Sequence, residues 1–523
     1  MMNIKGYVTE KINNNFMSEQ NTTKRIAKNT LMLYFRQILI MIVSLYTVRV
    51  VLNTLGAEDY GIYNVVAGVV TMFSFLSNSM ATASQRYFSY ALGQNDSEKL
   101  KKYFSMSFTI YCLIALIVLV LAETVGLWFV VNKLVVPLDR KDAAFWIYQS
   151  SVFSMIFTIL TAPFMASIIA HEDMNIYAYV SIIEVVLKFG IVFLLPLFAI
   201  DKLIFYGLLM AAVVFINTAI YRTICIKKYS ECKFSFFWEK DLFKELISYT
   251  GWNMFGAAVG VFKYQVVNII LNQFFNPIVN TARGIAQQVN SAVNSFAQNF
   301  STAVRPQIIK TYATGEKERM LQLMFRSCKA TFLLMYVFAL PLILEMPYVL
   351  KIWLKNVPEY AIVFTSLALI DALIDTISYP IMAAAQATGK IKLYQSVVGG
   401  VLLLNAPITF VVLKLGANPY SVFIVSIVIT FIAFIVRLCI LKRLIDFSFW
   451  KYIIKVFLPV VCCADIALVI PYFVKGLMQD SFLRLCVTVF VSVICVGLSG
   501  YFVALSKDER KWIVGIVKSK LGR

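Results

Sequence analysis

The sequence predicts an all-α integral membrane protein with about fourteen transmembrane helices. Of its 523 residues, 60% are hydrophobic and only 15% are charged, a balance that water-soluble domains do not need. The apolar residues gather between Thr30 and Leu505 in about fourteen stretches, each close to the roughly 20 residues that a helix needs to cross the hydrocarbon core. A membrane β-barrel would instead show short strands of alternating polarity, which the sequence lacks.

The charged residues predict the orientation of the helices. The chain has 48 Lys and Arg against 28 Asp and Glu, a net charge of +20. The basic excess lies in alternate short loops and in both terminal segments, as the positive-inside rule expects of cytoplasmic segments. We therefore expect cytoplasmic N and C termini, and no binding of nucleic acid, because the charge lies in thin loops rather than on one domain face.

A repeat divides the predicted helices into two groups of six. "PFMASIIAHEDMNIYAYV", from Pro163, aligns with "PIMAAAQATGKIKLYQSV", from Pro380, at an offset of 217 residues. A second pair of segments places Gly93 against Gly315, at an offset of 222. Because six is even, both copies insert in the same direction, and we expect pseudo-symmetric lobes related by an axis along the membrane normal.

The repeat and the loops give the predicted domain organisation. The order is a cytoplasmic N-terminal tail (1–28), an N-lobe of helices 1–6 (29–225), an amphipathic cytoplasmic linker (226–246), a C-lobe of helices 7–12 (247–443), helices 13 and 14 (444–506) and a cytoplasmic C-terminal tail (507–523). The linker alternates basic and aromatic residues, which suits a segment lying on an anionic membrane surface.

Cysteine and histidine give no sign of a metal centre or a catalytic triad. The nine cysteines lie mostly in apolar segments, without metal-ligand or disulfide spacing, and we interpret them as small core residues. The single histidine, His171, falls in a predicted loop, where we expect it to be solvated and without a partner. No metal site, cofactor or enzymatic activity is predicted.

A polar stripe follows the helices that the repeat makes equivalent, the second and the eighth. In helix 8, polar residues recur every three or four positions, which places them on one face: Arg283, Gln287, Asn290, Asn294, Gln298, Ser301 and Arg305. Helix 2 repeats the pattern with Asn78, Gln85 and Arg86 among others, helix 1 adds Arg36, and helix 7 adds Lys263. Amides and small residues often hold membrane helices together, but a residue at every turn and two arginines on one line favour a water-filled cavity between the halves.

The charges of the stripe indicate the kind of substrate. Its cations (Arg36, Arg86, Lys263, Arg283 and Arg305) suit an anion, and arginine suits phosphate in particular. The main acidic residues predicted at membrane depth include Glu184, which we expect to pair with Lys188, and Asp371 with Asp375 on another helix. These three are the candidates for ion coupling. Asp371 and Asp375 either balance nearby arginines or take up a proton or Na⁺ that drives transport.

Residues 29–96 resemble a known family. The stretch "TVRVVLNTLGAEDYGIYN" and the later "GQND" are similar to the amino-terminal signature of bacterial polysaccharide biosynthesis transporters. These are flippases for O-antigen or capsule repeat units in the multidrug, oligosaccharidyl-lipid and polysaccharide (MOP) exporter superfamily. The loops "AHEDMNIY" and "ATGKIKLYQ" are also similar, so the resemblance covers nearly the whole chain.

The resemblance implies two six-helix lobes forming a V-shaped cavity, lined by helices 1, 2, 7 and 8, plus two extra C-terminal helices. It also implies a multi-pass protein of the bacterial plasma (inner) membrane, which transports an undecaprenyl-pyrophosphate-linked oligosaccharide from the cytoplasmic to the periplasmic leaflet by ion-coupled alternating access. The five cations would then contact pyrophosphate or sugar, and four amides would face the sugar: Asn78, Gln287, Asn294 and Gln298. The implied partners are the lipid-linked glycan of lipopolysaccharide or capsule biosynthesis, membrane lipid, H⁺ or Na⁺, and the glycan polymerase machinery.

Three other functions fit parts of the pattern. A Na⁺- or H⁺-coupled multidrug or metabolite exporter of the same superfamily would be expected to carry an acidic or aromatic pocket for cations. A membrane glycan polymerase or ligase would carry a large outer loop with catalytic residues, whereas every predicted outer loop is short. A scaffold for glycan assembly would not need a polar cavity.

Overall fold

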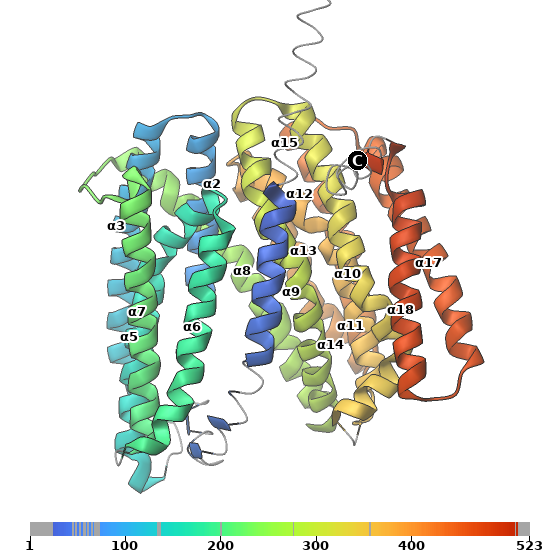
Figure 1. The fold of residues 1–523 in the computed structure, drawn as a ribbon, viewed down its shortest axis with the longest axis horizontal. Coiled ribbons are helices and arrows are strands. Elements are labelled where there is room, and N and C mark those ends of the chain that lie inside the picture. Colours follow the sequence, from blue (N-terminus) through green and yellow to red (C-terminus); the bar gives the residue numbers. More distant parts are fainter. Residues whose placement is uncertain are drawn as a thin grey trace, which may run out of the picture. The chain divides into compact units, whose positions relative to one another are not determined.

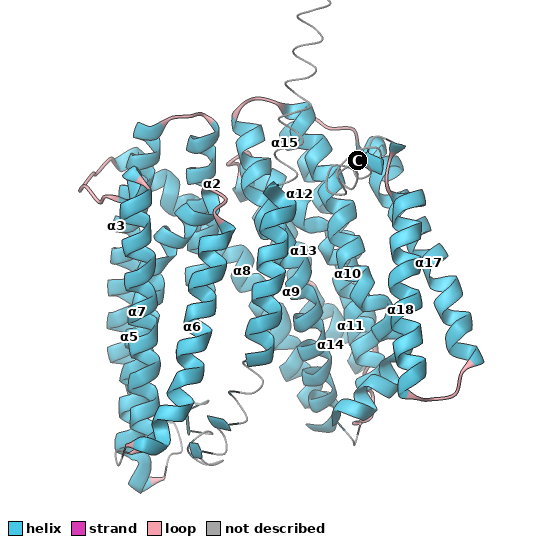
Figure 2. Cartoon of the chain, in the orientation of Figure 1, coloured by secondary structure: helices cyan, strands magenta, loops and turns pink. Residues whose placement is uncertain are grey.

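The protein is represented by a computed structural model that describes residues 25–43, scattered positions between 47 and 66, and then 74–132, 137–198, 201–275, 277–354, 357–507 and 509–510. The described residues form helices joined by turns and short loops, with no strand among them (Figure 2). Consecutive helical segments group into fourteen passes, which confirms the predicted fold class. The chain divides into two compact units, residues 1–257 and 258–523, which part within one helix.

The first unit contains the passes up to that shared helix (Figure 1). Their bounds are Arg25–Val43, α2 (Ser74–Gly93), α3 (Ser97–Leu121) continuing through the π-helical η1 (Ala122–Gly126) into α4 (Leu127–Asn132), α5 (Lys141–Ala170), α6 (Met174–Leu194), α7 (Lys202–Lys228) and the start of α8 (Lys240–Phe274). Helices α5 and α7 pack side by side, and α2 and α3 pack against α5. The predicted linker 226–246 therefore contains the ends of two helices, joined by the short η4 (Ser230–Cys232).

The second unit holds the rest of α8 and the passes that follow it. They are α9 (Pro277–Ala313), α10 (Lys317–Leu354), α11 (Ala361–Thr376) with α12 (Ser378–Ala387), α13 (Ile391–Leu403) with α14 (Asn405–Lys414), α15 (Ser421–Ile445), α16 (Phe449–Tyr452) with the π-helical η5 (Ile453–Phe457) and α17 (Leu458–Leu477), and α18 (Phe482–Ser499) with the π-helical η6 (Gly500–Ala504). Helix α9 packs against α10, α11 and α12.

Eleven passes are long and apolar enough, over their described residues, to cross a membrane. The remaining three are α2, α8 and α9. These are three of the four helices on which the sequence places the polar stripe, so the stripe itself lowers their hydropathy. Helices of this polarity need protein or water, rather than lipid, along part of their surface.

Turn geometry tests the two offsets of the repeat. The turn after α5 has a positive φ at Glu172, and the turn after α12 has one at Gly389, which confirms the offset of 217. The turn after α2 has its positive φ at Asn95, and the turn after α9 has its own at Gly315. That offset is 220, so the alignment of Gly93 with Gly315 was wrong by two residues. Asn tolerates the left-handed region better than most residues and replaces glycine there.

His171 has a partner, contrary to the prediction of a solvated loop residue. Its Nε2 lies 2.6 Å from Oε1 of Glu231, which is buried, and its ring stacks on Tyr229 at 4.3 Å between centroids. Tyr229 donates a hydrogen bond to Asp173, 2.5 Å away, and Lys228 pairs with the same carboxylate at 2.9 Å. Burial alone would raise the pKa of Asp173, but these two contacts outweigh it and hold that pKa below its ordinary value.

The cysteines only partly fit the prediction of core residues. All nine are free thiols. Cys225, Cys232, Cys328 and Cys463 are buried, as expected for small apolar side chains. Three others are exposed on their helices, so the prediction was wrong for them: Cys112, Cys439 and Cys486.

A buried ion pair joins α18 to a kink in α10. Helix α10 departs from helical geometry at Glu345, between Pro341 and Pro347, because proline removes a backbone donor and crowds the preceding turn. The Glu345 carboxylate accepts hydrogen bonds from Arg484 at 2.7 Å and from Thr488 at 3.0 Å, and its side chain is fully buried. The pair therefore satisfies two groups that could not stay in hydrocarbon alone.

We predict that Glu345→Ala destabilises the protein by about 3–5 kcal/mol, because it leaves the Arg484 guanidinium buried without its main counter-charge. The measurement is thermal unfolding of the purified protein in detergent. Asp480→Asn is the matched control, since Asp480 also contacts Arg484 but is 75% exposed, and it should cost less than 1 kcal/mol. Equal losses in the two variants would contradict the assignment.

Candidate functional site

The second unit contains a polar cavity of about 290 Å³ among five helices. Helix α8 contributes Lys263, α9 contributes Arg283, Gln287 and Asn290, α11 contributes Asp371 and Asp375, and α14 and α15 contribute Asn405 and Ser426. The structure thus brings together five of the predicted site residues. Among the ionisable residues that line this cavity, two cations face two carboxylates, so the cavity is balanced rather than positively biased.

Asp375 is held by a cation that the sequence prediction did not include. Arg437, on α15, places Nη1 2.8 Å from Oδ1 of Asp375. The arginine is 8% exposed overall and lies deep in the helix packing. The Asp375 side chain is 39% exposed, so the pair gives a buried guanidinium a counter-charge at the edge of the packing. This ion pair matches the first of the two roles predicted for Asp375, the balancing of an arginine.

Asp371 is held more loosely. Lys263 Nζ lies 3.9 Å from Asp371 Oδ2, beyond hydrogen-bonding distance, and donates instead to Thr430 at 3.5 Å. Ser426 donates to Asp371 Oδ2 at 2.9 Å. The second carboxylate oxygen, Oδ1, is buried and accepts no hydrogen bond within the described residues. A carboxylate with one unused oxygen, beside a cavity, can accept a proton or coordinate a small cation.

The stripe of α9 continues past the cavity toward the basic end of the helix. Asn294 accepts a hydrogen bond from the Tyr379 hydroxyl at 3.0 Å, which orients its amide. Gln298, one turn on, is exposed, and Arg305 is half-buried. The stripe therefore offers a cation at Arg283, amides along its middle and a second cation at Arg305.

The first unit holds Arg36 against α6. The Arg36 guanidinium lies over the Tyr177 ring, 4.6 Å from its centroid, and Nη1 donates to Ser181 at 3.4 Å. Arg36 is buried to 9% exposure. Stacking on an aromatic face stabilises a cation, so Tyr177 and Ser181 hold the Arg36 side chain against α6.

Arg86 lies in a box of tyrosines. Its guanidinium carbon is 4.5 Å from the ring centroid of Tyr87, 5.1 Å from that of Tyr90 and 5.5 Å from that of Tyr249. The arginine is 7% exposed, and Tyr87 packs edge-on against Tyr249. These rings join α2 to the start of α8 within the first unit, so Arg86 has a structural role alongside any contact with substrate.

Glu184 forms the predicted pair with Lys188, at 2.6 Å, which confirms that prediction. Its other oxygen accepts a hydrogen bond from Asn217 at 2.9 Å. Both carboxylate oxygens are thus occupied, unlike those of Asp371. The side chain of Asn78 lies outside the described residues.

We predict that Asp375→Asn destabilises the protein more than Asp371→Asn, by about 1–3 kcal/mol, because Asp375 makes a direct hydrogen-bonded ion pair and Asp371 does not. The measurement is thermal unfolding of both variants in the same detergent. Arg437→Met should reproduce the effect of Asp375→Asn, and the double variant should be less than additive. A larger loss in Asp371→Asn would reverse the two assignments.

Solved structures share this fold at low sequence identity. A multidrug resistance MATE-family transporter of the MOP superfamily, outward-facing, superposes with a TM-score of 0.72 at 10% identity, over 81% of this chain and 96% of that one. The MATE transporter ClbM in complex with Rb⁺ gives 0.66 at 14%, over 82% and 96%. A MOP superfamily transporter from Pyrococcus furiosus, whose binding pocket is described as reversed in polarity, gives 0.67 at 11%, over 80% and 96%.

The family comparison covers the first unit and the stripe of α9. Among curated protein sequences, none matches this chain significantly. The model of a family described as polysaccharide biosynthesis protein matches residues 26–312, more than half of the chain and all of the stripe. The chain therefore belongs to the polysaccharide biosynthesis protein family and has the fold of MOP superfamily transporters.

Proposed function

We propose that the protein is a flippase that moves an undecaprenyl-pyrophosphate-linked oligosaccharide, the repeat unit of O-antigen, capsule or exopolysaccharide, from the cytoplasmic to the periplasmic leaflet. The observation that carries the proposal is the polar face of α9, a helix of 37 residues, which has amides along its middle between two cations, Arg283 and Arg305. Family membership supports the glycan as substrate, and the transporter fold supports alternating access.

The chemistry of such a substrate matches the stripe. A pyrophosphate and many hydroxyl groups cannot cross hydrocarbon without replacements for their water. Arginine forks bind phosphate oxygens, and amides both donate to and accept from hydroxyls. Arg283 and Arg305, about 33 Å apart along α9 by the helix rise, would contact pyrophosphate at different stages of transport, and Gln287, Asn294 and Gln298 would contact sugar. The lipid tail can stay in the bilayer throughout.

Ion coupling is assigned to Asp371. Asp371 lines the cavity, and one of its carboxylate oxygens makes no hydrogen bond in the described part of the chain. Asp375 and Glu184 instead form direct ion pairs, with Arg437 and Lys188. Binding of H⁺ or Na⁺ at Asp371 would change its attraction to Lys263 and so bias the packing of α8 against its neighbours.

A second candidate is an exporter of cationic drugs or metabolites driven by Na⁺ or H⁺. The balanced charge of the cavity in the second unit favours it, because Asp371 could bind a cation and exchange it for a proton. The two functions differ in the residues on which they depend. A flippase needs the arginines of α9, and a cation exporter needs the carboxylate.

We predict that Arg283→Ala or Arg305→Ala traps undecaprenyl-linked glycan in the cytoplasmic leaflet, with protein in the membrane at its normal level. The measurement is mass spectrometry of lipid-linked oligosaccharide in each leaflet, in cells with the wild-type protein, either variant or none. Arg443→Ala is the control, since Arg443 is exposed and does not line the cavity. Normal glycan crossing in cells without the protein would exclude the flippase and leave the cation exporter as the leading function.

We predict that Asp371→Asn abolishes the dependence of transport on the H⁺ or Na⁺ gradient, because asparagine can neither take up a proton nor supply a charged ligand. The measurement is transport in proteoliposomes with and without an imposed ion gradient. Glu184→Asn, at a carboxylate already paired, should retain the dependence. An unchanged gradient response in Asp371→Asn would remove this residue from coupling.

A further inference from the structure

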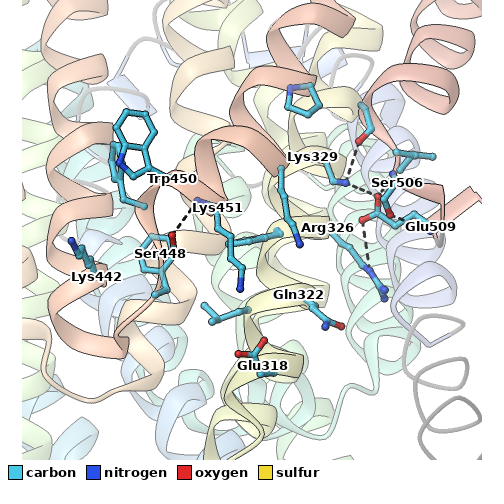
Figure 3. Close-up of a pocket in the computed structure, with 18 of the residues that line it drawn as sticks. Glu318, Gln322, Arg326, Lys329, Lys442, Ser448, Trp450, Lys451, Ser506 and Glu509 are labelled. Atoms are coloured by element: carbon cyan, nitrogen blue, oxygen red, sulfur yellow. Dashed lines mark hydrogen bonds and ion pairs between the residues drawn. The ribbon is translucent and has the colours of Figure 1, made fainter. Parts of the chain in front are cut away.

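A second and larger cavity, of about 1030 Å³, lies at the basic end of the second unit, away from the stripe. Figure 3 shows it between the start of α10, the end of α15, the α16 segment and the residues that follow η6. Its lining includes five cations and three carboxylates. Neither the stripe nor the proposed transport cycle uses these residues.

Part of this charge is neutralised within the protein. Lys329, which is 4% exposed, pairs with Glu509 at 2.5 Å and donates to the carbonyl of Ala504 at 3.1 Å. Arg326 lies 3.6 Å from the other oxygen of Glu509 (Figure 3). These contacts fix the back wall of the cavity and join α10 to the residues after η6.

Three lysines remain available at the mouth. Lys442, Lys451 and Lys455 are exposed, and the described residues include no carboxylate within ion-pair distance of them. The other lining carboxylates are Glu318 and Asp446, so the lysines leave a positive excess. Lysine ammonium groups bind phosphate as point charges.

An apolar row runs beside two of these lysines. Trp450, Ile454 and Leu458 are 70%, 62% and 54% exposed and recur every four residues, and the first two directly precede Lys451 and Lys455. Tryptophan is enriched at membrane interfaces, and exposed aliphatic side chains of a spanning helix face acyl chains. One segment therefore presents cations to a head group and apolar side chains to a tail.

The backbone is irregular on two sides of the cavity. The π-helical η5 contains Lys455, and the π-helical η6 contains Val503 and Ala504, all of which line it. Such segments are rare and occur frequently at functional sites, because the extra residue per turn turns side chains out of the regular packing.

We propose that this cavity binds the phosphate head group of an anionic membrane phospholipid, with its acyl chains along the apolar row of α16, η5 and α17. Lys442, Lys451 and Lys455 contact the phosphate, and the cavity volume accommodates the glycerol and head group. The site lies in the leaflet at the basic end of the helices. It does not depend on the proposed flippase, because lipid binding is measured without transport.

The test is native mass spectrometry of the delipidated full-length protein, titrated with phosphatidylglycerol or phosphatidylcholine of the same acyl chains. We expect phosphatidylglycerol to bind more tightly, and the variant Lys451→Gln/Lys455→Gln to lose about fivefold in relative affinity per lysine. The control Lys240→Gln/Lys244→Gln removes two exposed lysines at the same spacing, on the basic end of α8, and should keep the preference.

Three outcomes would overturn the proposal. The first is equal binding of both lipids by the wild-type protein. The second is an equal loss in the two double variants, which would show a diffuse surface effect. The third is displacement of phosphatidylglycerol by millimolar inorganic phosphate, which would show a site for a free anion. Thermal unfolding of each variant excludes loss of folding as the cause.

Discussion

The cost of placing an unpaired polar group in hydrocarbon determines most of this structure. The backbone avoids this cost by forming helices throughout the described residues, because a helix pairs its N–H and C=O groups internally. Buried ionised side chains avoid this cost by pairing, as Glu345 does with Arg484 and Arg437 does with Asp375. The polar face of α9 is the exception, since amides such as Gln298 remain exposed along it. A helix of this kind is stable in a membrane only if water or a polar substrate covers that face.

The helices could be predicted because apolar length and the period of 3.6 residues are local properties of the sequence. The repeat could be predicted for the same reason, but its register could not be read from residue identity alone. The turns after α2 and α9 require a positive φ at one position, and Asn95 meets that requirement where the other copy has Gly315. Matching glycine to glycine therefore shifted the alignment, whereas matching backbone conformation corrects it.

The candidate site was predicted as a face but not as a set of contacts. Spacing along one helix places Arg283, Gln287 and Asn294 together, so no tertiary information was needed. Arg437 lies 62 residues from Asp375 in the chain, and neither composition nor spacing signals that they meet. The same limit applies to Tyr249, which reaches Arg86 from α8, and to Glu231 beside His171, because each comes from another helix or turn.

The charge balance around Asp371 constrains how coupling could work. A proton on Asp371 would remove the carboxylate nearest Lys263 and strengthen anion binding there, and by reciprocity an anion would strengthen proton binding. Exchange of an entering proton for a departing glycan at a shared site requires the opposite relation, in which binding of the proton weakens binding of the glycan. In the proposed flippase, the pyrophosphate that exchanges for a proton is therefore better assigned to Arg305, which does not line this cavity, than to Lys263. Asp371 would then act on the packing of α8 and α11, and hence on conformation, rather than on the substrate directly.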